Sequence, residues 1–389
     1  MWLSEMTTLM PIDRESTALL RAIVRRPSDA HPIEPLAEKI RDWSSLLKMA
    51  QEQRVLPLLY LRLDEMGSSV PPAAQEQLSA AYQRNVFHSL ANAAELIGAL
   101  KAFDEEKIPV MPFKGVVLAA SAYHDLSGRP AGDLDLLIHH RDLIRATEVL
   151  VRRGYELKTR VHADGTPEAS NSYEYHFERQ SDGMIMELRW RLELTQPRFR
   201  RNLGLDWVWP QRRVAMLAGA TVPDMSPELT LLVLCMHGCK HAWSRLIWIR
   251  DVAQLLEAHP DLDWKKAVRE AKITGLWRAL ALGVLLAHRM ASAPAPDSML
   301  RRFDSDSTAH HMAVHFEENL FDAPGSTPPS YLPYSVQLLG FQDRVRLMSS
   351  LSFLRPNQRD RAFVRLPRGL HGLYFLIRPF RILMERSSR

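Results

Sequence analysis

Asp133-Leu134-Asp135-Leu136 places two aspartates at alternate positions of an apolar run. In an extended strand alternate side chains point to the same side, so Asp133 and Asp135 share one face while the leucines face a core. Two like charges held side by side repel each other, and a fold keeps such a pair mainly where a cation lies between them. Carboxylates arranged in this way suit Mg²⁺, which usually binds one or two protein carboxylates and substrate phosphates. The stretch therefore predicts a strand with a metal site, although a short pattern of this kind, taken alone, also fits a solvated strand edge.

The segment upstream of this strand has the order of a phosphate-binding unit. Residues 108–113 are apolar and predict a short buried strand, residues 116–123 predict a helix, and Lys114-Gly115 lies between them. Glycine allows the backbone to approach a ligand, and the start of a helix presents free N–H groups to an anion. Lys114 adds a mobile positive charge for a triphosphate. The alternative is an exposed lysine without a role.

Two further charged residues extend this candidate site. Arg129 lies in the turn 127–132 that leads into the acidic strand, where a guanidinium can reach phosphate or brace an aspartate. Glu187 lies between two large apolar residues in a second predicted strand, residues 183–190. Two-metal phosphoryl chemistry usually needs one more ligand than the aspartate pair supplies, so we predict that Glu187 is the third carboxylate.

Four parts of the chain resemble the uncharacterised nucleotidyltransferase family of the DNA polymerase β-like superfamily: Phe113-Lys114-Gly115, Arg129 with Asp133-Leu134-Asp135-Leu136-Leu137, Glu187-Leu188-Arg189-Trp190, and the segment from His237 to Asp251. The resemblance covers most of the chain. One difference concerns the turn before the aspartates. The superfamily pairs a Gly-Ser turn with the Asp-x-Asp motif after a short helix, whereas Lys114-Gly115-Val116 lacks the serine and the spacing here is longer.

The resemblance implies an α+β fold, in which a small mixed-sheet nucleotidyltransferase core is flanked by N- and C-terminal helical regions and the chain is mainly helical. It also implies a reaction that moves an NMP from an NTP to an acceptor hydroxyl and releases pyrophosphate, with two Mg²⁺ ions as cofactors. The sequence leaves open the acceptor (a small molecule, peptide, protein or RNA), the base preference and the oligomeric state. A catalytically silent nucleotide- or partner-binding relative is the alternative, because the Gly-Ser turn is altered.

The resemblance further implies roles for six residues of the predicted site. Asp133, Asp135 and Glu187 would bind the metal ions, Lys114 and Gly115 would hold the β- and γ-phosphates, and Arg129 would neutralise charge on the leaving pyrophosphate. Glu187 would also draw off the proton of the acceptor.

The segment Cys235-Met236-His237-Gly238-Cys239-Lys240-His241 contains two kinds of zinc ligand. On a helix the two cysteines share one face and the two histidines another. Because no second ligand cluster completes a four-coordinate site, we expect the cysteines to be buried apolar residues. The resemblance places His237 and His241 beside the catalytic unit as cofactor-binding candidates. Lining the substrate cleft, shuttling a proton and a structural hydrogen bond remain open as their roles.

The same segment continues with aromatic and charged residues. Trp243 and Trp248 either anchor a core, which is the commoner use, or stack on a base. Asp251 lies on an apolar helix and is expected to pair with an arginine. The candidate partners are Arg189, Arg245 and Arg250.

The periodicity of apolar residues divides the chain into three regions. They are an N-terminal helical region (1–106), an α/β nucleotidyltransferase core (107–225) and a C-terminal helical region with a basic tail (226–389). Helices are expected at 16–26, 43–52, 56–66, 73–106, 141–154, 227–242, 247–259, 264–273 and 276–291, and further strands at 155–158 and 172–179.

The composition places the chain among ordinary globular proteins, because hydrophobic residues make up 46% and charged residues 24% of 389. No stretch is long and apolar enough to span a membrane, and residues 1–5 lack the order of a secretory signal. Two cysteines exclude a disulfide framework, so we expect a cytoplasmic protein.

The formal charge of +5 is concentrated at one end of the chain. Residues 341–389 contain 11 arginines, no lysine and three acidic residues. A nucleic-acid-binding protein that uses this Arg-rich tail is therefore another functional alternative, with anionic lipid or a phosphorylated substrate as other partners of the tail. The apolar periodicity of residues 370–384 instead favours a packed terminal helix with solvated arginines.

Overall fold

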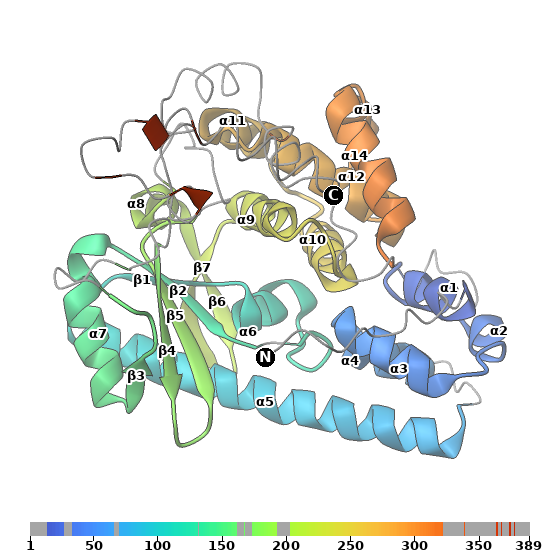
Figure 1. The fold of residues 1–389 in the computed structure, drawn as a ribbon, viewed down its shortest axis with the longest axis horizontal. Coiled ribbons are helices and arrows are strands. Elements are labelled where there is room, and N and C mark those ends of the chain that lie inside the picture. Colours follow the sequence, from blue (N-terminus) through green and yellow to red (C-terminus); the bar gives the residue numbers. More distant parts are fainter. Residues whose placement is uncertain are drawn as a thin grey trace. The chain divides into compact units, whose positions relative to one another are not determined.

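The computed structural model describes residues 14–26, 33–65, 70–130, 132–161, 173–192 and 203–321, together with residues 167, 338, 363, 364, 367, 373, 374 and 377. The chain divides into two compact units, residues 1–338 and 339–389. All helices and strands discussed below belong to the first unit (Figure 1). Most of the terminal helix predicted at 370–384 and most of the Arg-rich tail lie outside the described residues.

A five-stranded mixed sheet forms the centre of the first unit (Figure 1). β2 and β5 run parallel, whereas the other neighbouring strands run antiparallel. In spatial order the strands are β1 (Val110–Phe113), β2 (Leu134–Ile138), β5 (Met184–Arg189), β4 (Glu174–Arg179) and β3 (Tyr155–Leu157). The sequence predicts all five, and the α+β, mainly helical fold class is confirmed.

Helices surround this sheet. Before it come α1 (Arg14–Ile23), α2 (Glu34–Ala37), α3 (Trp43–Glu52), α4 (Leu56–Glu65) and α5 (Pro72–Glu105); between its strands lie α6 (Gly115–Leu118), a π-helical turn (Ala119–Tyr123) and α7 (Leu143–Arg152); after it come α8 (Leu205–Val208), α9 (Pro227–Lys240), α10 (Leu246–Ala258), α11 (Trp264–Thr274), α12 (Trp277–Ala291), α13 (Asp297–Asp304) and α14 (Ser307–Asn319). The helices predicted within the described residues are confirmed. The short helices α2 and α8 and the helices α13 and α14 are not among the predictions.

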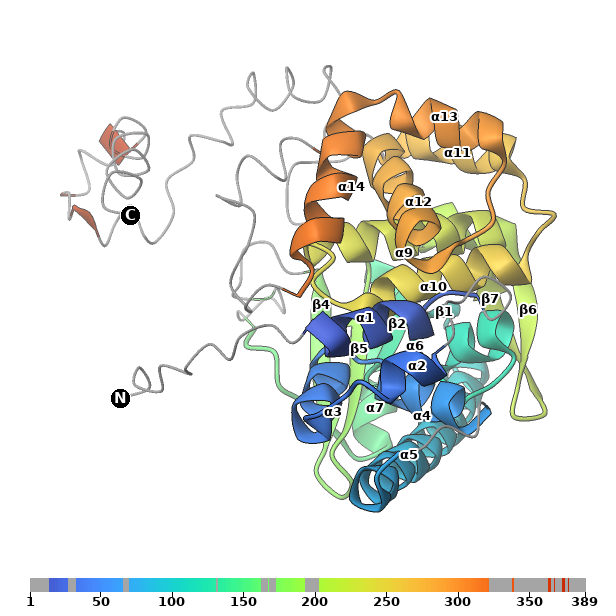
Figure 2. The ribbon, with the colours of Figure 1, turned by 90° about the vertical axis from the view of Figure 1, so that its right-hand side faces the viewer.

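The sheet separates two helical layers. α5 and α7 pack on one face, where Leu134 and Leu136 join a hydrophobic cluster with Phe103. α9 and α10 lie on the other side in both views, and Phe113 and Leu137 belong to the cluster that includes these helices (Figures 1 and 2). Alternate residues of β2 therefore pack into two different hydrophobic clusters. The face of β2 that carries the aspartates is turned toward α9 and α10.

A two-stranded hairpin accompanies the sheet and is absent from the sequence predictions. Its strands are β6 (Arg212–Leu217) and β7 (Ala220–Met225), and β7 lies beside β1. Ala218 and Gly219 form the turn with positive φ of 47° and 84°, as a two-residue hairpin turn requires. Val214 and Met216 are exposed, so the strand lacks the apolar-in pattern that marks most half-buried strands.

The N- and C-terminal helical regions share one hydrophobic cluster within the described residues. Leu20 and Leu59 belong to it together with Leu246 and Ile249. The predicted boundaries at residues 106 and 225 remain a prediction about the organisation of the chain. None of the described helices has the length and apolar character needed to cross a membrane.

The turn between α9 and α10 is fixed by Trp243, which is fully buried. Its ring lies against Gly238 of α9, where an added Cβ would come within 2.6 Å of three ring carbons. Trp243 is thus a core anchor, the commoner of the two uses expected for it. Cys235 and Cys239 are free and buried on the same helix, as predicted.

Gly238→Ala is expected to lower the free energy of unfolding by roughly 1–3 kcal/mol, because a rigid buried ring has no room to yield. Urea denaturation followed by circular dichroism measures the change. The control is Gly98→Ala in α5, where the nearest atom to an added Cβ is the movable tip of Arg153 and alanine gains helix propensity. Equal stabilities of the two variants would contradict this account of the turn.

Candidate metal and nucleotide site

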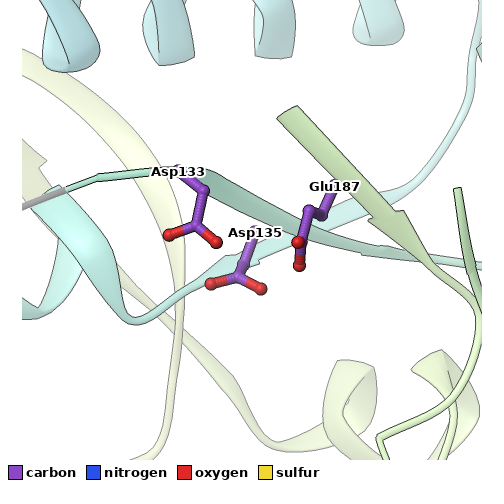
Figure 3. A group of neighbouring side chains, drawn as sticks. All are labelled: Asp133, Asp135 and Glu187. Carbon is purple, nitrogen blue, oxygen red and sulfur yellow. The ribbon is translucent and has the colours of Figure 1, made fainter. Parts of the chain in front are cut away.

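The structure brings the three predicted carboxylates together. Asp133 and Asp135, at the start of β2, lie beside Glu187 of the neighbouring strand β5 (Figure 3). One carboxylate oxygen from each of the three lies within 4.8 Å of the others. Among the described residues this is the one group of three or more acidic, histidine or cysteine side chains with the spacing of a metal site. The hard oxygen donors fit Mg²⁺ better than a soft metal.

Strand pairing explains why residues so far apart in sequence meet. Asp135 is the register partner of Glu187 in the parallel pair and of Phe113 in the antiparallel pair, and His176 is the partner of Glu187 on β4. These residues form one row across four strands and point to one face. Asp133, two residues before Asp135, joins them on that face.

Two cations of the chain already contact Asp135, whose side chain is buried. Lys114 Nζ lies 3.0 Å from Oδ2, and Arg189 Nε lies 3.1 Å from Oδ1. Burial raises the pKa of this carboxyl, but the attraction of Lys114 and Arg189 outweighs it and the pKa of Asp135 is lowered. Both cations approach the oxygens that a divalent ion would use, so such an ion would have to share Asp135 with them or displace them.

Arg189 links the acidic residues of this face. Besides Asp135, its guanidinium contacts Glu187 and Glu174, the latter being its register partner on β4. Burial raises the pKa of Glu187, and this effect together with the repulsion of Asp135 and Asp133 exceeds the opposing attraction of Arg189. Glu187 is therefore a better proton acceptor than an exposed glutamate.

The backbone of the Lys114–Gly115 turn adopts an uncommon conformation. Lys114 has φ 59° and ψ −147°, close to a region that is almost restricted to glycine, and Gly115 has φ 47°. An added Cβ at Gly115 would meet the Asp133 carbonyl at an unstrained 3.5 Å, so the positive φ, rather than space, favours glycine there. The strained lysine backbone directs the Lys114 side chain toward Asp135.

Arg129 braces an aspartate, one of the two uses that the sequence allows. Its Nε and Nη2 donate to the two carboxylate oxygens of Asp251 at 2.7 and 2.9 Å, and its Nη1 donates to the Gly115 carbonyl at 3.2 Å. Tyr123 also donates to Asp251, at 2.8 Å. The predicted partners of Asp251 are thus wrong: Arg189 binds the carboxylates of the sheet and Arg250 binds Glu257.

The remaining predicted partner, Arg245, lies over the ring of Trp248, 5.4 Å from its centroid. The pairing with Arg129 connects residues 122 positions apart, and neither spacing nor helix periodicity indicates it.

His237 and His241 line the same cleft and their rings lie 4.7 Å apart, with Trp248 against both. Removal from water, together with nearby cations such as Lys114 and Lys240, lowers the pKa of both imidazoles, that of His241 to about 4. Both histidines are consequently neutral at pH 7. Of the roles open from the sequence, the position of these rings agrees with lining the cleft.

The cleft has a volume of about 500 Å³, a size found for small-molecule sites. Four cations that line it are not among the site residues predicted from the sequence: Arg54, Arg189, Lys240 and Arg245. Lys240 and Arg245 lie in the His237–Asp251 segment, whose resemblance to the family is the sequence signal that could have identified them. Arg54 follows an ordinary amphipathic helix, and nothing in its neighbourhood distinguishes it from a surface arginine.

A family model described as "Uncharacterised nucleotidyltransferase" matches residues 39–292 of the chain. The protein therefore belongs to this family. No match is found among curated proteins. One similar solved structure is an antigenic nucleotidyltransferase-like protein from Paracoccidioides brasiliensis, with 19% identity and a TM-score of 0.27 over 47% of this chain and 88% of the other.

Asp251→Ala is expected to lower the free energy of unfolding by roughly 3–5 kcal/mol, because it leaves the guanidinium of Arg129 buried without its counter-charge. Chemical denaturation of the full chain measures the loss. Asp182→Ala is the matched control, since Asp182 forms an exposed pair with Arg179 and such pairs contribute at most about 1 kcal/mol. A loss at Asp251 no larger than at Asp182 would exclude a stabilising role for the buried pair.

Glu187→Gln is expected to stabilise the metal-free protein at neutral pH. Because the pKa of Glu187 is raised in the folded chain, the folded state holds the proton more tightly, and ionisation lowers the free energy of unfolding as pH rises above the ordinary glutamate range. The advantage of the variant should grow as pH rises above the ordinary glutamate range, level off once the folded carboxyl has ionised, and vanish at the acid end. Thermal unfolding in a chelating buffer tests this, with the exposed Glu148→Gln on α7 as control; a pH-independent difference would refute it.

Proposed function

We propose that this protein is a metal-dependent nucleotidyltransferase that moves an NMP from an NTP to an acceptor hydroxyl. The observation that carries the proposal is the convergence of Asp133, Asp135 and Glu187 within 4.8 Å on one face of the sheet, in a chain of a nucleotidyltransferase family. Divalent ions held by these carboxylates would stabilise the negative charge on the phosphoryl group during its transfer.

In the proposed reaction the acceptor oxygen forms a bond to the α-phosphorus, and the bond from that phosphorus to the bridging oxygen of pyrophosphate breaks. The acceptor proton passes to Glu187, whose raised pKa suits this task. The elements of the chain act mainly by positioning, as is usual in phosphoryl transfer. Arg129 donates a hydrogen bond to the Gly115 carbonyl, so it holds the turn beside the aspartates in place.

Lys114 is a further phosphate-binding candidate. Its ammonium is the cation nearest to Asp135, and a bound divalent ion would compete with it for the same carboxylate. Once displaced, the side chain can turn toward the phosphates that share the ion. The Gly115 backbone begins a helix beside it.

Asp135→Asn is expected to reduce nucleotidyl transfer on the order of 10²–10³-fold, because it removes one charge from the metal site while preserving its shape. The measurement follows label from each α-³²P NTP, with Mg²⁺, into separated RNA, protein and small-molecule fractions. Asp182→Asn, outside the cleft, should transfer at the wild-type rate. Label incorporation that survives both Asp135→Asn and EDTA would contradict the proposal.

The second candidate is a catalytically silent nucleotide-binding relative. It is favoured by the Lys114–Asp135 and Arg189–Asp135 contacts, in which the chain itself neutralises the carboxylate. Thermal-shift titration separates the two candidates: stabilisation by an NTP with Mg²⁺, without label transfer to any of the three fractions, supports the silent form.

A further inference from the structure

Three cations in the cleft have no acidic partner among the described residues: Arg54, Lys240 and Arg245. The two cations that the sequence predicts to bind phosphate, Lys114 and Arg129, are instead paired with carboxylates. Lys114 contacts Asp135, and Arg129 donates two hydrogen bonds to Asp251. The positive charge that is free to meet a ligand therefore comes from outside the α/β core.

Arg54 and Arg245 lie near each other at the end of the cleft that holds Asp133. Arg54 ends the turn between α3 and α4, and Arg245 immediately precedes α10. After burial, the charge of Arg245 is the largest cause that lowers the pKa of Arg54, followed by Arg129. Among acidic residues, Asp133 has the largest opposing effect, because its charge raises the pKa of Arg54.

Backbone contacts hold the two turns together. Gln53, the residue before Arg54, accepts a hydrogen bond at its side-chain oxygen from the Leu246 N–H at 2.8 Å, and its carbonyl accepts one from the Ile247 N–H at 3.4 Å. Leu246 directly follows Arg245. The two turns that carry the arginines are thus joined through residues that directly precede or follow Arg54 and Arg245.

Each guanidinium is also supported individually. Arg54 Nη2 lies 3.1 Å from the place where a Cβ on Gly132 would stand, so the absence of a side chain at Gly132 lets the arginine reach the backbone beside Asp133. The Gly132 carbonyl is itself held by the buried Asn92 amide at 3.1 Å. Arg245 lies over the ring of Trp248, which limits its motion.

Two partly buried, mutually repelling guanidinium groups destabilise a folded chain unless an anion binds between them. Guanidinium forks match phosphate oxygens in a bidentate manner. The pair lies beside the carboxylates that would hold divalent ions, and those ions bind phosphate oxygens at the same time. A polyphosphate that reaches from the metal site toward Arg54 and Arg245 satisfies all of these charges.

We infer that Arg54 and Arg245 form a clamp for the terminal phosphates of the NTP, a role that rests on the proposed function. The triphosphate is thereby held by two turns of the N- and C-terminal helical regions, whereas Arg129 positions the Gly115 turn without touching phosphate. The nucleoside makes no contribution to this clamp, so inorganic tripolyphosphate is a sufficient probe.

The test is calorimetric titration of the full chain with tripolyphosphate in the presence of Mg²⁺. Arg54→Ala and Arg245→Ala should each weaken binding roughly 10- to 100-fold, since a charge-assisted hydrogen bond contributes about 1.5–3 kcal/mol. Arg54→Lys and Arg245→Lys keep the charge and should lose less. The exposed Arg41→Ala, on the same N-terminal region, should bind as the wild type does.

Mn²⁺ titration of the same variants shows whether the carboxylates are intact, and unchanged Mn²⁺ affinity with weakened tripolyphosphate binding supports the clamp. If the alanine variants fail to fold, Arg54→Gln and Arg245→Gln take their place, because glutamine keeps much of the side chain and removes the charge. Affinities within twofold of wild type in the folded alanine or glutamine variants would overturn the inference, as would a wild-type chain that binds NTP but not tripolyphosphate. Neither result bears on label transfer, which judges the proposed function separately.

Discussion

Repulsion among three carboxylates on one face of the sheet is the constraint around which the cleft is built. The parallel register of β2 and β5 sets Asp135 opposite Glu187, so the charges cannot separate without breaking the pairing. Lys114 and Arg189 reduce the repulsion from opposite sides of Asp135. The pKa of Glu187 nevertheless stays raised, chiefly because this carboxyl is buried and in addition because Asp135 and Asp133 repel its charge. A divalent cation shared by the three oxygens would relieve the remaining repulsion more effectively than either side chain.

The helical regions complete what the sheet begins. Asp251 of α10 holds Arg129 and, through it, the Gly115 carbonyl, while Gln53 ties the end of α3 to the start of α10. The acidic half of the cleft therefore comes from the strands, and the free positive charge comes from turns between helices. Since both halves depend on the common hydrophobic cluster, loosening of either helical region would move the cations relative to the carboxylates.

The sequence predicts those features that depend on local periodicity. The Asp-Leu-Asp-Leu alternation indicates both a buried strand and the shared face of Asp133 and Asp135, and the helices follow from apolar spacing. Glu187 could be proposed as the third carboxylate. Its register opposite Asp135 could not be predicted, because it depends on how two strands distant in sequence pair in the folded chain. The Arg129–Asp251 pair and the position of Arg54 arise from packing between distant segments, for which no residue pattern exists. The hairpin was missed because Val214 and Met216 face solvent and remove the usual contrast between its two faces.

Lys114 connects the metal site with the phosphate site on energetic grounds. A divalent ion at Asp135 must displace or share the ammonium that lies 3.0 Å from Oδ2, and the displaced charge is left in a cleft already rich in cations. A triphosphate supplies the counter-charge, so its binding lowers the cost of that displacement. Linkage requires the converse, because metal at the carboxylates then raises the affinity for triphosphate by the same factor. In the proposed enzyme the ion and the nucleotide would consequently bind as a cooperative pair, and the strained Lys114 backbone would keep the side chain within reach of both.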